Sequence, residues 1–88
     1  MIARSYVRLG NHLAAIATER RAGEPRTIAS SIERATGHAV SHREISSYLE
    51  GEGLPSPRFM RAFAEAFSLT REERRRLAWM YTFSRLPD

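Results

Sequence analysis

Apolar residues recur along the chain at intervals of three and four, the spacing that brings side chains to one face of an α-helix. The first segment with this spacing covers residues 2–21, and its apolar positions are Ile2, Tyr6, Leu9, Leu13, Ile16 and Ala17. Gly23 and Pro25 follow and predict the end of this helix. No segment shows the two-residue alternation of a half-buried strand, so the pattern predicts an all-α protein.

Two short helices are predicted in the middle of the chain. The first covers residues 26–36, where one face carries Ile28, Ala29, Ile32 and Ala35, and Gly37 stands where a left-handed C-terminal cap is expected. The second covers residues 41–50 and opens with a capping box, in which Ser41 and Glu44 each satisfy a free backbone amide. Its apolar face is Ile45, Tyr48 and Leu49, and Gly51 and Gly53 predict its end.

Two further helices are predicted after this pair. Ser56 is a good N-cap with Pro57 at the first helical position, and the apolar face that follows is Phe59, Met60, Phe63, Ala64 and Phe67. Thr70 and Glu73 form a second capping box that opens a helix over residues 71–84, with Leu77, Met80 and Tyr81 on one side. The connectors are short, so we expect one compact five-helix domain over residues 1–88.

The helix predicted over residues 41–50 has a polar face. If Ile45 and Tyr48 anchor it in the core, the side chains that point outward are His42, Arg43, Ser46 and Ser47. The major groove of DNA is about 12 Å wide and admits one helix, and histidine and arginine donors suit guanine N7 and O6. This face therefore predicts base contacts, and the alternative is a solvated helix surface with no ligand.

Two stretches carry a family resemblance: residues 59–70, and the run Val40-Ser41-His42-Arg43-Glu44-Ile45-Ser46-Ser47-Tyr48-Leu49-Glu50-Gly51 followed by Leu54-Pro55-Ser56-Pro57. The run is similar to the recognition helix and exit turn of the Xre/Cro/C1-type helix-turn-helix regulators, and residues 59–70 are similar to the fourth helix of that family. The resemblance covers residues 27–77 and implies a lambda-repressor-like fold with a helix-turn-helix at about 27–51. Ala29 stands farther before Ile45 than the family pattern has it, so residues 33–39 are expected to form a longer turn or a longer second helix.

The resemblance implies a sequence-specific transcriptional regulator of double-stranded DNA, such as a phage Cro or immunity repressor, a prophage regulator or an antitoxin. It implies base contacts from His42, Arg43 and Ser47, with Ser46 on the same polar face. It implies phosphate contacts at helix starts, where free amides carry a partial positive charge, from Arg26, Thr27, Ser41, Ser56 and Arg58. The alternative function is a helical protein-interaction module or antitoxin whose main partner is another protein.

Trp79 and Phe83 stand one turn apart, away from the apolar side of the last predicted helix. They either close the core against the first helix or form an exposed strip that binds a second copy. Helix-turn-helix proteins commonly bind DNA as dimers, so these two residues are candidate dimer contacts.

The chain carries 14 basic residues, all of them arginine, and 10 acidic residues, for a net charge of +4. Nucleic acid is the commonest partner of a small basic domain, although codon bias in a GC-rich genome would equally explain the absence of lysine. Consecutive helical residues do not share a face, so we expect Arg74, Arg75 and Arg76 to be solvated, with Glu72 and Glu73 partly neutralising them.

Several classes of function are not expected. The sequence has no cysteine, which excludes disulfides, thiolate zinc sites and a cysteine nucleophile. His38 and His42 are four residues apart, but Gly37 and Ser41 interrupt the helix between them, so no metal is expected, and His12 is expected at the surface. We find no catalytic grouping and expect no enzyme, cofactor or small-molecule ligand. No apolar run is long enough for a bilayer span and residues 1–10 lack a signal-peptide core, so a cytoplasmic location is expected.

Overall fold

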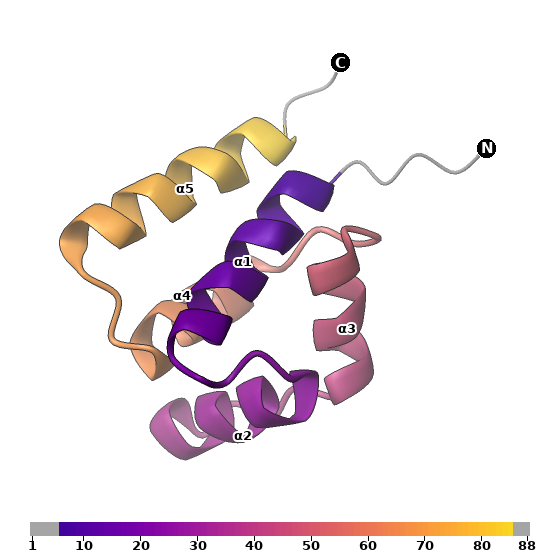
Figure 1. Cartoon of the computed structure of the whole chain (residues 1–88), viewed down its shortest axis with the longest axis vertical. Coiled ribbons are helices and arrows are strands. Elements are labelled where there is room, and N and C mark those ends of the chain that lie inside the picture. Colours follow the sequence, from indigo (N-terminus) through magenta and orange to yellow (C-terminus); the bar gives the residue numbers. More distant parts are fainter. Residues whose placement is uncertain (1–5, 86–88) are drawn as a thin grey trace.

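The structure is a computed structural model that describes the backbone of residues 6–85 and the side chains of residues 6–84. Within that range it contains five helices and no strand: α1 Val7–Glu19, α2 Pro25–Thr36, α3 His42–Glu50, α4 Pro57–Ala66 and α5 Arg71–Arg85 (Figure 1). The radius of gyration is 12.1 Å, as expected of a compact domain of this length. The all-α prediction is confirmed. The predicted first helix, over residues 2–21, is longer than α1 within the described residues, since Tyr6 is its N-cap and Arg20 its C-cap; Ile2 lies outside the described residues.

Side-chain caps start three of the helices. The Ser56 hydroxyl accepts the Phe59 amide hydrogen (3.1 Å), and Thr70 and Glu73 form both reciprocal bonds of a capping box, at 3.1 and 2.9 Å. Ser41 likewise accepts from the Glu44 amide (3.1 Å). The prediction that the Glu44 carboxylate accepts a backbone amide hydrogen at the helix start is wrong. That carboxylate accepts from the Tyr48 hydroxyl (3.3 Å), one turn along the same helix.

The core is formed by one apolar face from each helix. Its most fully buried side chains are Leu9, Leu13, Ile28, Ile32, Ile45, Phe59 and Phe63, and α5 contributes Leu77. A row of ring contacts runs from Tyr48 of α3 through Phe59 and Phe63 to Phe67, with centroid separations of 4.8, 6.0 and 4.8 Å. Ala35, predicted on the apolar face of the second helix, is exposed.

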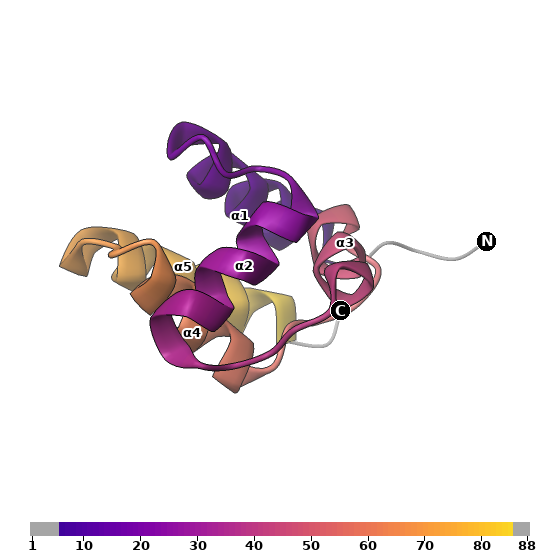
Figure 2. The ribbon, with the colours of Figure 1, turned by 90° about the horizontal axis from the view of Figure 1, so that it is seen from below.

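Helix α1 packs against α3 and α5, and α2 packs against α3 and α4. Figures 1 and 2 show that α2 begins beside α3 and runs away from it.

The crossing of α1 and α3 depends on Gly10. A Cβ at this position would lie 2.5 Å from the Tyr48 carbonyl oxygen and 2.6 Å from that of Leu49, closer than such atoms approach. Only glycine therefore lets α1 lie this close to the C-terminal end of α3.

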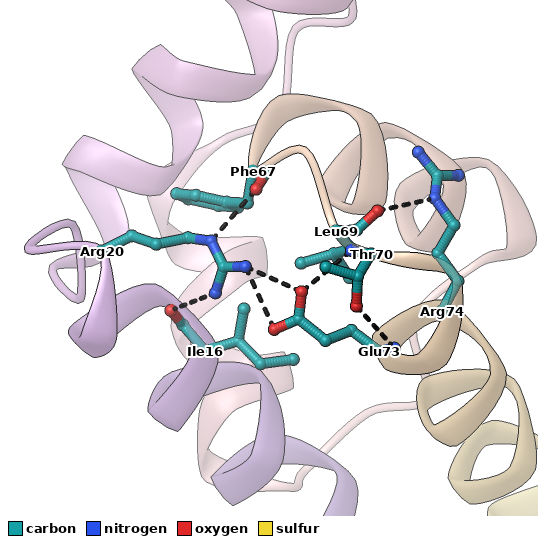
Figure 3. A network of polar contacts seen from close by, with 7 residues as sticks. All are labelled: Ile16, Arg20, Phe67, Leu69, Thr70, Glu73 and Arg74. Atoms are coloured by element: carbon teal, nitrogen blue, oxygen red, sulfur yellow. Dashed lines mark hydrogen bonds and ion pairs between the residues drawn. The ribbon is translucent and has the colours of Figure 1, made fainter.

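Arg20 ties the end of α1 to the α4–α5 turn (Figure 3). Its guanidinium donates to the carbonyl oxygens of Phe67 (3.0 Å) and Ile16 (3.3 Å) and to the Glu73 carboxylate at 2.9 and 3.1 Å. The Thr70 amide and Arg20 together lower the pKa of Glu73. We expected Glu73 to neutralise the neighbouring arginines; instead it pairs with Arg20, because the fold brings the end of α1 to the start of α5.

Candidate nucleic-acid interface

Helix α3 is anchored by Ile45, whose side chain is completely buried, while His42, Arg43 and Glu44 are exposed. Successive helical residues are rotated by about 100°, so Arg43, Ser47 and Glu50 point away from Ile45. The predicted orientation of α3, with Ile45 in the core and His42 and Arg43 pointing outward, is the one observed. Tyr48 and Leu49 are only half-buried and pack at the edge of the core.

The two serines of this face are less accessible than expected. Ser46 and Ser47 are both half-buried. The Glu52 amide donates to the Ser47 carbonyl oxygen (3.0 Å), which folds the following loop back over the helix end. The Ser47 hydroxyl then lies next to Gly53, 3.4 Å from where a Cβ on that glycine would be. Exposed Glu50, seven residues after Arg43, also lies on the outward face; it was not among the predicted site residues, although the helical spacing indicates it.

The segment between α2 and α3 combines a longer helix with a turn. Helix α2 continues through Thr36 and ends at Gly37, which has the left-handed φ of 75° expected of a C-cap. The Thr36 hydroxyl donates to the Ile32 carbonyl oxygen (2.7 Å) and accepts from the His38 amide (3.1 Å). The turn therefore starts at Gly37. Arg34 is exposed on α2, and His38 is half-buried in the turn.

The predicted phosphate contacts lie at the starts of three helices. Arg26 and Thr27 are exposed in the first turn of α2, where the N-cap makes no side-chain bond to the backbone. Ser41 starts α3, and Ser56 and Arg58 are exposed at the start of α4. The packing of Tyr48 against Phe59 holds the start of α4 beside α3, and α2 also packs on α3.

The positive charge of the chain does not lie on these three helices. Residues 24–61 hold five arginines and five glutamates, so their net charge is zero. The remaining residues hold nine arginines and five acidic residues, and these account for the whole net charge of +4. The overall charge indicated nucleic-acid binding, but the excess lies on α5, which holds five arginines and two glutamates, and on Arg20 and Arg21, which follow α1.

Trp79 and Phe83 are 60% and 58% exposed, which excludes the alternative that they close the core. Their rings stack on each other with centroids 4.5 Å apart. Two residues along a helix correspond to a rotation of about 200°, so Trp79 points away from the half-buried Tyr81. Tyr81 packs against the core, so the exposed aromatic pair is turned away from the core.

His12 was expected at the surface, but it is half-buried on the side of α1 that faces α5. Burial lowers its pKa, the charge of Arg76 lowers it further, and Glu73 opposes this change. The described residues contain no group of three or more metal-ligating side chains. Among residues 6–85, no helix has both the length and the apolar character that a membrane span requires.

Comparisons of the chain with known protein families, with curated proteins and with solved structures find no match. The helix-turn-helix assignment therefore remains a prediction from the residues and their geometry.

Proposed function

We propose that this chain binds double-stranded DNA in a sequence-specific manner, with α3 in the major groove, and acts as a transcriptional regulator. One observation carries the proposal: α3 is fastened by Ile45 while His42 and Arg43 are exposed on it. Neither side chain makes a hydrogen bond or ion pair with another described residue. Their donors are therefore free for guanine N7 and O6, the acceptors that arginine binds most often in the major groove.

Ser41 and Ser56 support the same proposal. Each hydroxyl oxygen accepts a backbone amide hydrogen, which leaves the hydroxyl hydrogen free to donate to a phosphate oxygen. Arg26, Thr27 and Arg58 supply further donors at the starts of α2 and α4. Contacts of this kind set the position of a protein on DNA, and the base contacts select the sequence.

The neutral charge of residues 24–61 favours base-specific binding over charge-driven coating of DNA. Affinity falls with salt by a logarithmic slope of about 0.9 for each phosphate that is neutralised. If Arg26 and Arg58 neutralise one phosphate each, the expected slope is only about 2. A protein that coats DNA without sequence preference would need many more phosphate contacts.

The test is a selection of bound sequences from a random double-stranded DNA pool, repeated with two variants. We expect the wild type to enrich one motif. Arg43→Ala should lose about 1–3 kcal/mol of binding free energy on that motif, with little change in its affinity for random DNA. Arg71→Ala is the matched control, because Arg71 is exposed at the start of α5. Failure to enrich a motif, or equal weakening of Arg43→Ala on the motif and on random DNA, would contradict base recognition by α3.

The exposed Trp79 and Phe83 favour a second candidate function, a protein-interaction module. In that case no DNA sequence is enriched at about 0.1 M salt, where screening is moderate. A protein partner then co-purifies with the wild type and not with Trp79→Ala.

A further inference from the structure

The outward side of α5 combines exposed aromatic rings with charge. We name it the α5 outer face and define it by Glu72, Arg75, Arg76, Trp79 and Phe83. These residues line an open groove of about 830 Å³ together with Arg8 of α1, Met80 and Ser84. Tryptophan, phenylalanine, methionine and arginine are the residues enriched at the centres of protein–protein interfaces. The composition of this face therefore indicates a protein partner.

We infer that a second copy of this chain covers the α5 outer face, forming an antiparallel pair of α5 helices centred on Trp79. This inference does not depend on DNA binding. It rests on how the exposed residues are arranged about Trp79. Arg75 stands four residues before Trp79 and Phe83 stands four residues after it.

In an antiparallel pair related by a two-fold axis at Trp79, a residue that stands a given number of positions before Trp79 in one copy faces the residue that stands the same number of positions after Trp79 in the other copy. Trp79 then meets Trp79 of the second copy, and Arg75 lies opposite Phe83 of the second copy. A guanidinium over an aromatic ring is an attractive cation–π arrangement. The outer face is thus complementary to itself in this orientation.

The two Arg75 side chains stay apart in this arrangement, whereas the two Arg76 positions are offset by six residues, about 9 Å along the helix axis. Arg75 and Arg75 of the second copy are separated by eight residues along the helix axis, about 12 Å at the helical rise. This exceeds the screening length of about 10 Å at 0.1 M salt. A parallel pair would place the two Arg75 side chains directly against each other, which is why the antiparallel pair is favoured.

The expected dimer is weak. An aromatic side chain offers about 150–250 Å² for burial, so the exposed parts of four rings amount to roughly 400–600 Å². Specific stable interfaces bury about 1,200–2,000 Å². Contacts from the arginines and Met80 add to the aromatic area, and we expect a dissociation constant of about 10–100 µM.

The first test is sedimentation of the full chain, without DNA, from about 5 to 500 µM, a range that brackets the expected constant. The wild type is expected to pass from monomer to dimer, and Trp79→Ala to weaken association by about tenfold or more. Arg75→Glu should weaken it as well, while Arg61→Glu, an equal charge change at an exposed position of α4, should not. Circular dichroism confirms that each variant is folded. A wild type that stays monomeric throughout, or a Trp79→Ala variant that associates as well as the wild type, overturns the inference.

The second test reads the register, since the chain has no cysteine of its own. A disulfide requires Cα atoms within about 7 Å. Arg75→Cys mixed with Phe83→Cys should therefore give a cross-linked heterodimer in a redox buffer, identified by mass. Each variant alone should stay largely uncross-linked. Cross-linking of Arg75→Cys with itself in preference to the mixture would overturn the antiparallel register.

Discussion

Replacing Gly10 by alanine tests how closely α1 and α3 pack, and with it the position of the proposed recognition helix. The new Cβ would lie 2.5 and 2.6 Å from the carbonyl oxygens of Tyr48 and Leu49. These are backbone atoms, so no side-chain rotation can relieve the contact, and one helix must move by several tenths of an ångström. Overpacking of this kind costs typically 1–3 kcal/mol, with larger values where nothing can yield.

The intrinsic preference of a helix acts in the opposite direction. Alanine in place of glycine inside a helix stabilises by about 1 kcal/mol when nothing obstructs the side chain. We take the cost at the upper end of the overpacking range, because three backbone atoms lie within 3.0 Å of the new Cβ. The expected net loss of unfolding free energy is about 1–2 kcal/mol, which lowers Tm by about 5–15 °C in a domain of this size.

The assay is thermal unfolding followed by circular dichroism, together with chemical denaturation. Gly53→Ala is the matched control, because its Cβ would meet only the Ser47 hydroxyl at 3.4 Å and the Tyr48 ring at 4.0 Å. We expect the control to change stability by less than about 0.5 kcal/mol. A Gly10→Ala protein that is as stable as the wild type, or more stable, would refute the close approach of α1 to α3.

Three further predictions concern binding, the core and pH. Arg58→Ala should weaken binding to all DNA sequences alike and reduce the salt slope by about one unit, measured by titration at several salt concentrations; an unchanged slope would argue against a phosphate contact. Ile45→Asp should bury an unpaired charge at a completely buried position and cost several kcal/mol, so a normal melting curve would show that α3 is not anchored there. The pKa of Glu73 is lowered in the folded state, so ionised Glu73 contributes to the free energy of unfolding. That contribution is present above the ordinary glutamate pKa of 4.5 and is lost as the pH falls through the lowered pKa. Glu73→Gln should therefore flatten the acid side of the stability–pH curve, and an unaltered curve would show that the bonds of the Glu73 carboxylate to the Thr70 amide and to Arg20 do not stabilise the fold.

The local structure of the chain could be read from the sequence with few errors. The caps at Ser41, Ser56 and Thr70 each depend on a hydrogen bond between residues three positions apart, so the residues that form each cap are close together in the sequence. The left-handed Gly37 and the buried Ile45 follow in the same way from local spacing. Such features depend on few distant neighbours, and a pattern along one segment is sufficient to predict them.

The tertiary structure alone decided which distant residues meet. Arg20 and Glu73 are 53 positions apart, and nothing in either segment indicates the other. The close approach at Gly10 exists only because α1 crosses the end of α3, and the loop after α3 covers Ser47 only because it folds back over that helix. The same packing leaves Trp79 exposed. Local spacing determines which face of each helix is apolar, whereas the order in which those faces pack determines what remains on the outside.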